Sequence, residues 1–164
     1  INKGKYLDET LEDTAHTSFC IGVAGYPEKH FEAPNRLTDL ENLKRKVDAG
    51  ASYIVTQMFF DNARFFRFRD ECRQIGIEVP VIAGIKPVSA LNDINLLPQT
   101  FHIDMPNELV RELRKCKTDR EAREAGIEWA TMQSKELISE GVPGIHYYTL
   151  GRSDNVARIV KGAF

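Results

Sequence analysis

Residues 39–61 form the stretch DLENLKRKVDAGASYIVTQMFFD, a polar helical segment followed by a glycine and an apolar run. In the helical part, Leu40, Leu43 and Val47 fall on one stripe at 100° per residue. The glycine ends that helix, and the run YIVTQMFF (53–60) has the composition of a strand that is covered on both faces. A helix that leads into such a strand is typical of parallel α/β folds.

The rest of the chain repeats this alternation of strand and helix. Apolar runs followed by turn residues predict three further strands, FCIGVAG (19–25), VPVIAGI (79–85) and GIHYYTL (144–150). We expect helices over 37–49, 63–75, 89–97, 105–116 and 119–140, and a short one after Ser153. Strands that are separated by helical crossovers pair in parallel, so the sequence predicts an α/β fold.

Four such strands need cover on both faces, which a doubly wound sheet or a (β/α)8 barrel provides. Four β/α units over residues 19–164 would make half a barrel, whose edge strands and open interior must be closed by further chain or by another copy. Residues 1–18 are polar, without an amphipathic period, and begin with Ile1 instead of Met. We expect them to be a linker or the remnant of a preceding segment, in a fragment of a longer protein.

The composition is that of one ordinary domain and disfavours several classes of function. Of 164 residues, 42% are hydrophobic and 28% are charged, which is enough for a real core. The net charge of −2 argues against nucleic acid or an acidic membrane surface as partner. No apolar run approaches the roughly 20 residues of a membrane span. Cys20, Cys72 and Cys116 form no CxxC pair, which predicts reduced thiols in the cytoplasm and no zinc site.

A polar stripe of Asp39, Asn42 and Lys46 borders the apolar stripe of the first helix. One interpretation is a solvated face with helix-stabilising charge pairs. The other is a ligand site, because Arg45 and Lys46 suit the phosphate of a ligand. The loop GYPEKHFEAP (25–34) precedes this helix and follows a strand directly, at the end where parallel α/β folds bind ligands.

That loop taken alone fits a structural role as well as a ligand-binding one. His30 and Glu32 resemble a metal-binding pair, but no third ligand accompanies them, so no metal is expected. The P-loop motif, the dinucleotide-binding fingerprint and the nucleophile elbow of hydrolases are also missing from the sequence.

Gln57 does not fit the apolar run around it, because a buried primary amide costs about 1–3 kcal/mol when its hydrogen bonds are unmet. It shares strand parity with Tyr53, Val55 and Phe59 and lies near the C-terminal end of the strand, where a barrel places its active-site layer. Satisfaction by neighbouring backbone groups is the alternative. Arg152 would reach the same rim, and the two side chains together suit the recognition of amide and carboxylate groups.

Several stretches together resemble the C-terminal half of the catalytic barrel of methylenetetrahydrofolate reductases: VAGYPEKHFEAPN, DLENLKRKVDAGASYIVTQMFFD, VIAGIKPV and GIHYYTLGR. The similarity runs from about residue 19 to at least residue 155, in matching order. It implies a (β/α)8 barrel that binds FAD non-covalently. The family reduces 5,10-methylenetetrahydrofolate to 5-methyltetrahydrofolate with electrons from NAD(P)H, and hydride moves first to the flavin and then to the folate.

By motif position, the resemblance implies which residues contact each ligand. FAD would be contacted by Tyr26, His30, Ala33, Asp39, Asn42, Arg45 and Lys46. The folate would be contacted by Gln57 and Arg152, and also at Asp93, where the family often has Gln, and at Leu97, where some members have Phe.

The resemblance assigns no catalytic residue to this chain. The family's acidic residue that is proposed to protonate the folate lies on the first barrel strand, and an Asp near the reactive end of the flavin follows the fourth. We therefore expect the 164 residues alone to have little or no turnover. Because an isolated half barrel leaves open edges, we also expect self-association as a homo-oligomer. The alternative is a non-catalytic half barrel that serves as a binding or assembly module. A phosphate-binding aldolase or isomerase is disfavoured, because a glycine-rich phosphate loop and an obvious Schiff-base lysine are missing.

Overall fold

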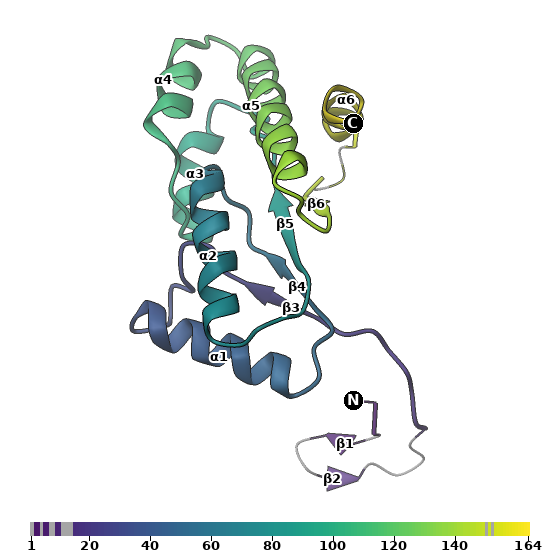
Figure 1. Cartoon of the computed structure of the whole chain (residues 1–164). Helices are drawn as coiled ribbons and strands as arrows, with labels where there is room; N and C mark the ends of the chain where they lie inside the picture. Colours follow the sequence, from purple (N-terminus) through teal and green to yellow (C-terminus); the bar gives the residue numbers. More distant parts are fainter. Residues whose placement is uncertain (1, 4, 7–8, 11–14, 150, 152) are drawn as a thin grey trace.

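Four parallel strands form the central sheet of the protein, in the order β3-β4-β5-β6 (Figure 1). The computed structural model describes residues 2–3, 5–6, 9–10, 15–149, 151 and 153–164. The strands are β3 (Gly22–Gly25), β4 (Tyr53–Thr56), β5 (Val81–Ile85) and β6 (Ile145–Tyr147). Because each strand pairs in parallel with the next one along the chain, the predicted α/β fold is confirmed, and its topology is that of part of a (β/α)8 barrel.

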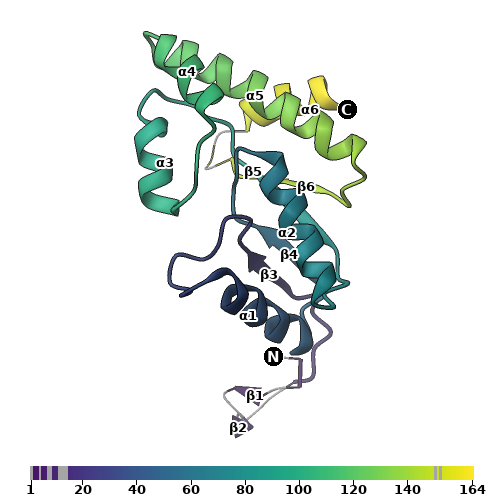
Figure 2. The same cartoon turned by 60° about the vertical axis from the view of Figure 1, so that its left-hand side comes forward.

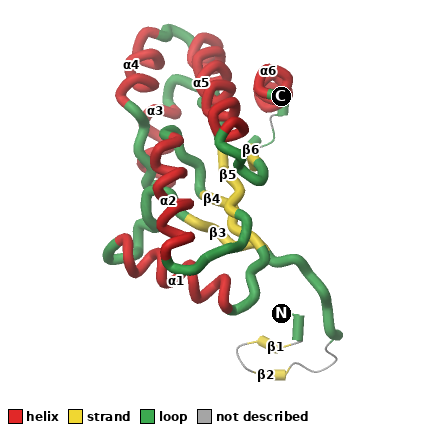
Figure 3. Tube along the Cα trace, viewed as in Figure 1, coloured by secondary structure: helices red, strands yellow, loops and turns green. Residues whose placement is uncertain are grey.

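Helices alternate with these strands as the sequence predicts (Figure 3). They are α1 (Arg36–Asp48), α2 (Asn62–Gln74), α3 (Asp93–Phe101), α4 (Asn107–Lys115), α5 (Asp119–Ser139) and α6 (Asp154–Ala163). Gly50, Gly76 and Gly141 follow three of the helices with positive φ, which is the backbone conformation that lets glycine end a helix.

The structure differs from the prediction before α3 and within the N-terminal segment. The helix that was expected over 89–97 begins only at Asp93, because the Asp93 carboxylate accepts hydrogen bonds from the backbone N–H groups of Ser89 and Ala90 and holds them in a turn. Within residues 1–18, two short antiparallel strands, β1 (Lys5–Tyr6) and β2 (Glu9–Thr10), were not predicted. They lie away from the central sheet in both views (Figures 1 and 2).

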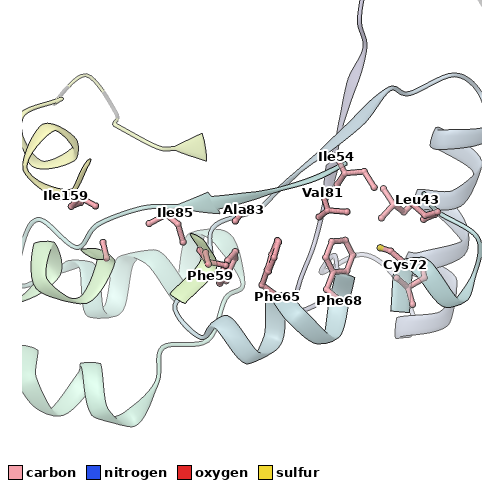
Figure 4. Close-up of a cluster of buried hydrophobic side chains, with 14 of the residues drawn as sticks. Leu43, Ile54, Phe59, Phe65, Phe68, Cys72, Val81, Ala83, Ile85 and Ile159 are labelled. Carbon is pink, nitrogen blue, oxygen red and sulfur yellow. The ribbon is translucent and has the colours of Figure 1, made fainter. Parts of the chain in front are cut away.

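The main core lies between the sheet and the helices that cover one of its faces. Figure 4 shows Phe65 and Phe68 of α2 directed toward Ile54 of β4 and Val81 of β5, and all four are buried. Burial of one such apolar side chain contributes about 1.5–3 kcal/mol, so this layer supplies much of the free energy of folding. The same cluster continues to Ile159 of α6, which packs beside α5.

The other face of the sheet is more open. Tyr53 and Val55 of β4 and Ile82 of β5 alternate with the buried residues and are only half-buried. In a barrel this face points to the interior, and Gln57 continues the same row. This row is therefore less covered than the row that faces the helices.

A second core cluster supports the loops at the C-terminal ends of the strands. It contains Met58 and Phe60, which follow β4, together with Val88, Leu97 and residues of α4 and α5. The strand that was expected to run to residue 60 ends at Thr56, because Met58 and Phe60 leave the sheet to pack in this cluster.

Gly84 of β5 lies where the neighbouring backbone comes closest. Its N–H donates to Thr56 Oγ1 at 2.9 Å, and the Tyr148 ring crosses over it to donate from Oη to the Thr56 carbonyl oxygen at 2.9 Å. A Cβ atom at this position would overlap that carbonyl oxygen and lie 2.9 Å from Tyr148 Cε2. The site therefore requires glycine for space.

Gly84→Ala is expected to lower the free energy of unfolding by about 3 kcal/mol or more, because the new methyl group meets rigid backbone on β4. Gly144→Ala is the matched control, since the nearest atom to a Cβ there is Ile82 Cγ2 at 3.9 Å. Urea unfolding of both variants measures the difference. Equal stability of the two would contradict the close approach at Gly84.

Candidate functional site

The loop after β3 is anchored to two helices. Arg36, the first residue of α1, donates from Nη1 to the Tyr26 carbonyl oxygen at 2.7 Å. Its Nε and Nη2 atoms donate to Glu71 Oε2 of α2 at 2.8 and 2.6 Å. Asn35 caps α1 by accepting from the Thr38 N–H at 2.9 Å. These contacts fix the loop against the N-terminal end of α1.

A hollow of about 430 Å³, which we name the α1 hollow, lies between this loop and α1. It is lined by Tyr26, His30, Glu32, Ala33, Pro34, Asp39, Asn42 and Lys46. Six of the seven residues that the sequence predicts to contact the cofactor are therefore brought together. Arg45, the seventh, is outside the lining and donates from Nη1 to Asn42 Oδ1 at 3.3 Å.

The walls of the α1 hollow combine an aromatic pair with charged and amide groups. The rings of Tyr26 and His30 meet edge to face, with centroids 4.5 Å apart. Asp39 Oδ2 accepts from the His30 backbone N–H at 3.0 Å, so the helix holds the loop as well as lining the hollow. Burial, with smaller contributions from Asp39 and Glu32, raises the pKa of Tyr26.

Gln57 lines a much smaller adjoining hollow of about 10 Å³, which shares Tyr26 with the α1 hollow. We name it the rim hollow, and it is lined by Tyr26, Pro27, Glu28, Lys29, Gln57, Met58, Phe101, His102 and Ile103. The Gln57 backbone N–H donates to the Gly25 carbonyl oxygen at 2.8 Å, and its Oε1 accepts from the Met58 N–H at 3.0 Å. The amide oxygen is thus held by backbone, which leaves the –NH2 group to donate toward a ligand.

Glu28 of the rim hollow is a residue that sequence reasoning missed. Its side chain is 9% exposed, and Oε2 accepts from the Asp104 N–H at 2.9 Å. Oε1 is buried without a hydrogen bond among the described residues, and Arg64 Nε lies 3.9 Å away, too far to donate. Burial raises the pKa of Glu28 to about 7. The only sequence signal was its place in a loop at the C-terminal end of a strand.

Lys86, which follows β5 directly, is a second residue that sequence reasoning missed. It is 6% exposed, and its Nζ donates to the Pro87 carbonyl oxygen at 3.3 Å. Burial lowers the pKa of Lys86, and the nearby Asp93 carboxylate opposes part of this shift. In the sequence this lysine follows an apolar strand and resembles an ordinary turn residue.

The remaining predicted folate contacts lie in different surroundings. Asp93 is buried, and its Oδ2 accepts from the Ser89 N–H at 2.8 Å and the Ser89 hydroxyl at 3.2 Å. Leu97 is 2% exposed and packs within the second core cluster. Arg152 lies outside the described residues. The structure thus brings Gln57 to the ligand end of the sheet and holds Asp93 in the turn before α3.

A further hollow of about 360 Å³ lies between α2, α4 and α5, on the helical side of the protein. Its buried polar groups satisfy one another: Asn62 Nδ2 donates to Glu136 Oε2 at 2.7 Å, and Gln133 Nε2 donates to Asn62 Oδ1 at 3.1 Å. Across the described parts of the chain, no three His, Cys, Asp or Glu side chains gather as a metal site would require. No helix there is both long and apolar enough to cross a membrane.

The fold and the α1 hollow define a class: a barrel-type α/β protein with a hollow at the C-terminal ends of its strands, which is where such folds bind ligands. The family model for methylenetetrahydrofolate reductase matches residues 5–163, which begins within the segment that was expected to be a linker. The chain therefore belongs to the methylenetetrahydrofolate reductase family, a family of (β/α)8 barrel oxidoreductases.

Relatives from bacteria, plants and animals support this assignment. The chain is 42% identical over 137 residues to the 5,10-methylenetetrahydrofolate reductase of Salmonella typhimurium, covering 83% of the chain and 46% of the relative. It is 42% identical over 142 residues to methylenetetrahydrofolate reductase (NADH) 1 of Arabidopsis thaliana, and this match covers 80% of the chain and 24% of the relative. It is 37% identical over 145 residues to the probable methylenetetrahydrofolate reductase (NADPH) of Caenorhabditis elegans, and this match covers 87% of the chain and 22% of the relative.

The solved structures include one with a similar fold. This protein, from Clostridium thermocellum, is described as an uncharacterized protein that binds two copies of 5-methyl-5,6,7,8-tetrahydrofolic acid. The TM-score is 0.55 at 16% identity, and the match covers 87% of our chain and 51% of that chain. The chain thus spans about half the length, or less, of the proteins that it matches.

Glu28→Gln is expected to raise stability at pH 8 and to leave it nearly unchanged near pH 4.5. The folded state holds the Glu28 proton up to about pH 7, whereas the unfolded chain releases it near 4.5, so the stability that Glu28 contributes is lost as pH rises between these values. The gain at pH 8 should be about 1–2 kcal/mol, allowing for screening by water.

Thermal unfolding at several pH values measures this gain, with Glu41→Gln on the exposed face of α1 as the control. A gain for Glu28→Gln that does not change with pH would refute a buried, protonated Glu28.

Proposed function

We propose that this chain supplies the FAD-binding and part of the folate-binding half of a reductase that converts 5,10-methylenetetrahydrofolate to 5-methyltetrahydrofolate with electrons from NAD(P)H. The observation that carries the proposal is the α1 hollow, where six predicted cofactor contacts meet beside Gln57 in a chain of this family. The acid–base groups of the reaction are not assigned to these 164 residues.

The residues of the α1 hollow suit a flavin dinucleotide in charge and in hydrogen-bonding groups. Lys46 on the wall and Arg45 at its edge would neutralise the phosphates, while Asp39 and Asn42 would bind hydroxyl or amino groups. The Tyr26–His30 pair offers an aromatic surface for a ring of the cofactor. When bound, FAD would supply the hydride acceptor for NAD(P)H and the hydride donor for the folate.

Gln57 would orient the folate at the rim. Its oxygen is held by the Met58 N–H, so the amide hydrogens would donate to an acceptor on the pterin edge. Glu28 faces the same rim hollow, and near pH 7 a substantial fraction of its carboxyl groups stays protonated and able to donate. The similarly folded protein from Clostridium thermocellum, which is described as binding 5-methyl-5,6,7,8-tetrahydrofolic acid, is consistent with a folate as the ligand.

We further propose a cytoplasmic homo-oligomer. The half-buried row of Tyr53, Val55 and Ile82 supports self-association of these 164 residues by themselves, because a second copy would remove from water the apolar side chains that the rest of a barrel would otherwise cover. Relatives are named for NADH and for NADPH, so the proposed electron donor is NAD(P)H.

Lys46→Met is expected to weaken FAD binding about tenfold or more, because one charge-assisted hydrogen bond to phosphate contributes about 1.5–3 kcal/mol. The matched control is Lys44→Met on the same helix, since Lys44 pairs with Asp48 and lies outside the lining of the hollow. Titration with FAD, followed by flavin fluorescence in the full gene product, gives both affinities. Self-association without any flavin binding would instead favour a non-catalytic assembly module.

Gln57→Glu is expected to reduce kcat/KM for the folate at least tenfold while leaving the FAD content unchanged. The substitution replaces the donating –NH2 with a carboxylate that repels an acceptor, a loss of about 1–3 kcal/mol. Folate reduction and bound flavin are measured on the same preparation. Parallel loss of flavin and folate activity would make Gln57 a structural residue.

A further inference from the structure

Lys86 is a buried charge that neither proposed binding role uses. Its ammonium carries three N–H donors, yet within the described residues it donates one hydrogen bond, to the carbonyl oxygen of Pro87, the next residue. Asp93 is the carboxylate that acts on it, but Asp93 Oδ2 is already bonded to the turn at Ser89 and Ala90. The ammonium is therefore sequestered from water without full replacement of its hydrogen bonds.

The alternation of β5 predicts that Lys86 lies on the face of the sheet opposite the helix-covered core. Val81, Ala83 and Ile85 belong to that core, so Ile82, Gly84 and then Lys86 continue the opposite row. Val55 and Ile82 are the last pair of the β4–β5 ladder. Gln57 lies two residues beyond this pair and Lys86 lies four residues beyond it, so Lys86 is further along its strand toward the C-terminal end.

Burial of Lys86 at this position lowers the stability of the folded protein. A buried ammonium with unmet donors destabilises a protein, and an apolar side chain of similar length would fill the same space without that cost. Unfavourable groups of this kind collect where a ligand supplies the missing partner. The C-terminal end of a barrel strand is such a place.

We propose that Lys86 is a specificity-determining residue that binds a carboxylate or phosphate oxygen of the ligand, one layer outside Gln57. This inference rests on the proposed function, since it takes the ligand to be a folate or a nicotinamide nucleotide. If Gln57 holds the pterin edge, Lys86 lies toward the mouth, where the remainder of the molecule leaves. The glutamyl carboxylate of a folate and the pyrophosphate of NAD(P)H are the two sources of such an oxygen.

The test is the affinity of Lys86→Met for matched ligands in the full gene product. The probes are 5-methyltetrahydrofolate, 5-methyltetrahydropteroate (which lacks the glutamyl group), NADH and NADPH. A tenfold or greater loss for the folate without loss for the pteroate identifies the carboxylate as the partner. A similar loss for both nucleotides, with the folate unaffected, identifies the phosphate.

Stability provides the readout that separates binding from structure. A ligand-binding Lys86 predicts that the urea midpoint of Lys86→Met is unchanged or higher while affinity falls. Lys86→Gln, which keeps a donor but loses the charge, should bind with intermediate affinity and covers the case in which the Met variant folds poorly. Lys135→Met on the exposed face of α5 is the control and should match the wild type in both measurements.

Two outcomes overturn the role of Lys86 alone. In the first, the wild type and both Lys86 variants bind every probe with equal affinity. In the second, Lys86→Met has a lower urea midpoint and loses the same affinity for every probe, including the pteroate. Failure of the wild type to bind any of the four probes would overturn the proposed function together with the role of Lys86. The two failures are therefore distinguishable by the behaviour of the wild-type protein.

Discussion

The contact between Gly84, Thr56 and Tyr148 governs the geometry of the ligand end. Gly84 donates to the Thr56 hydroxyl, and Tyr148 donates to the Thr56 carbonyl oxygen, so both polar groups of Thr56 face β5 and β6. The regular ladder between β4 and β5 stops here, after the pair of Val55 with Ile82. Because the chain after Thr56 is released from that ladder, Met58 and Phe60 can pack in the second core cluster while Gln57 stays at the rim.

The α1 hollow depends on a loop that is held in a costly conformation. Lys29 has φ of 111°, a value that side chains other than glycine rarely adopt, and its Nζ donates to the His30 carbonyl oxygen at 2.8 Å. Arg36 and Asp39 hold the loop from α1 through bonds to Tyr26 and His30. A strained segment that is held on several sides is typical of ligand sites, where the required geometry outweighs the local cost.

The sequence allowed the element order and the polar stripe of α1 to be predicted, because both follow from periodicity. Leu40 and Leu43 fix which side of α1 is buried, and Asp39, Asn42 and Lys46 then face the loop. Strand ends were less predictable, since Met58 and Phe60 are as apolar as strand residues and only their packing shows that they have left the sheet.

Two buried charged residues could not be predicted from periodicity. Glu28 and Lys86 look like surface residues in the sequence. Glu28 is buried beside the backbone at Asp104, far along the chain, and Lys86 is buried near Asp93, seven residues further on. The resemblance to a family identified Gln57 through its motif, but a motif match carries over known contacts and does not indicate which other groups lose water on folding. Such groups are found only when burial and hydrogen bonds are counted in three dimensions.

Glu28 of the rim hollow and Lys86 after β5 carry opposite charges when ionised, and burial pushes both toward their neutral forms. The pKa of the carboxyl is raised and that of the ammonium is lowered, because burial keeps water from both groups. A ligand that brings a donor to Glu28 or an anion to Lys86 restores the charged form and gains the corresponding attraction. The large core on the helical face of the sheet includes Phe65 and Phe68. Its free energy of folding offsets the cost of burying Glu28 and Lys86. Stability therefore comes mainly from the helix-covered face of the sheet, whereas the two hollows lie beside the loop that follows β3.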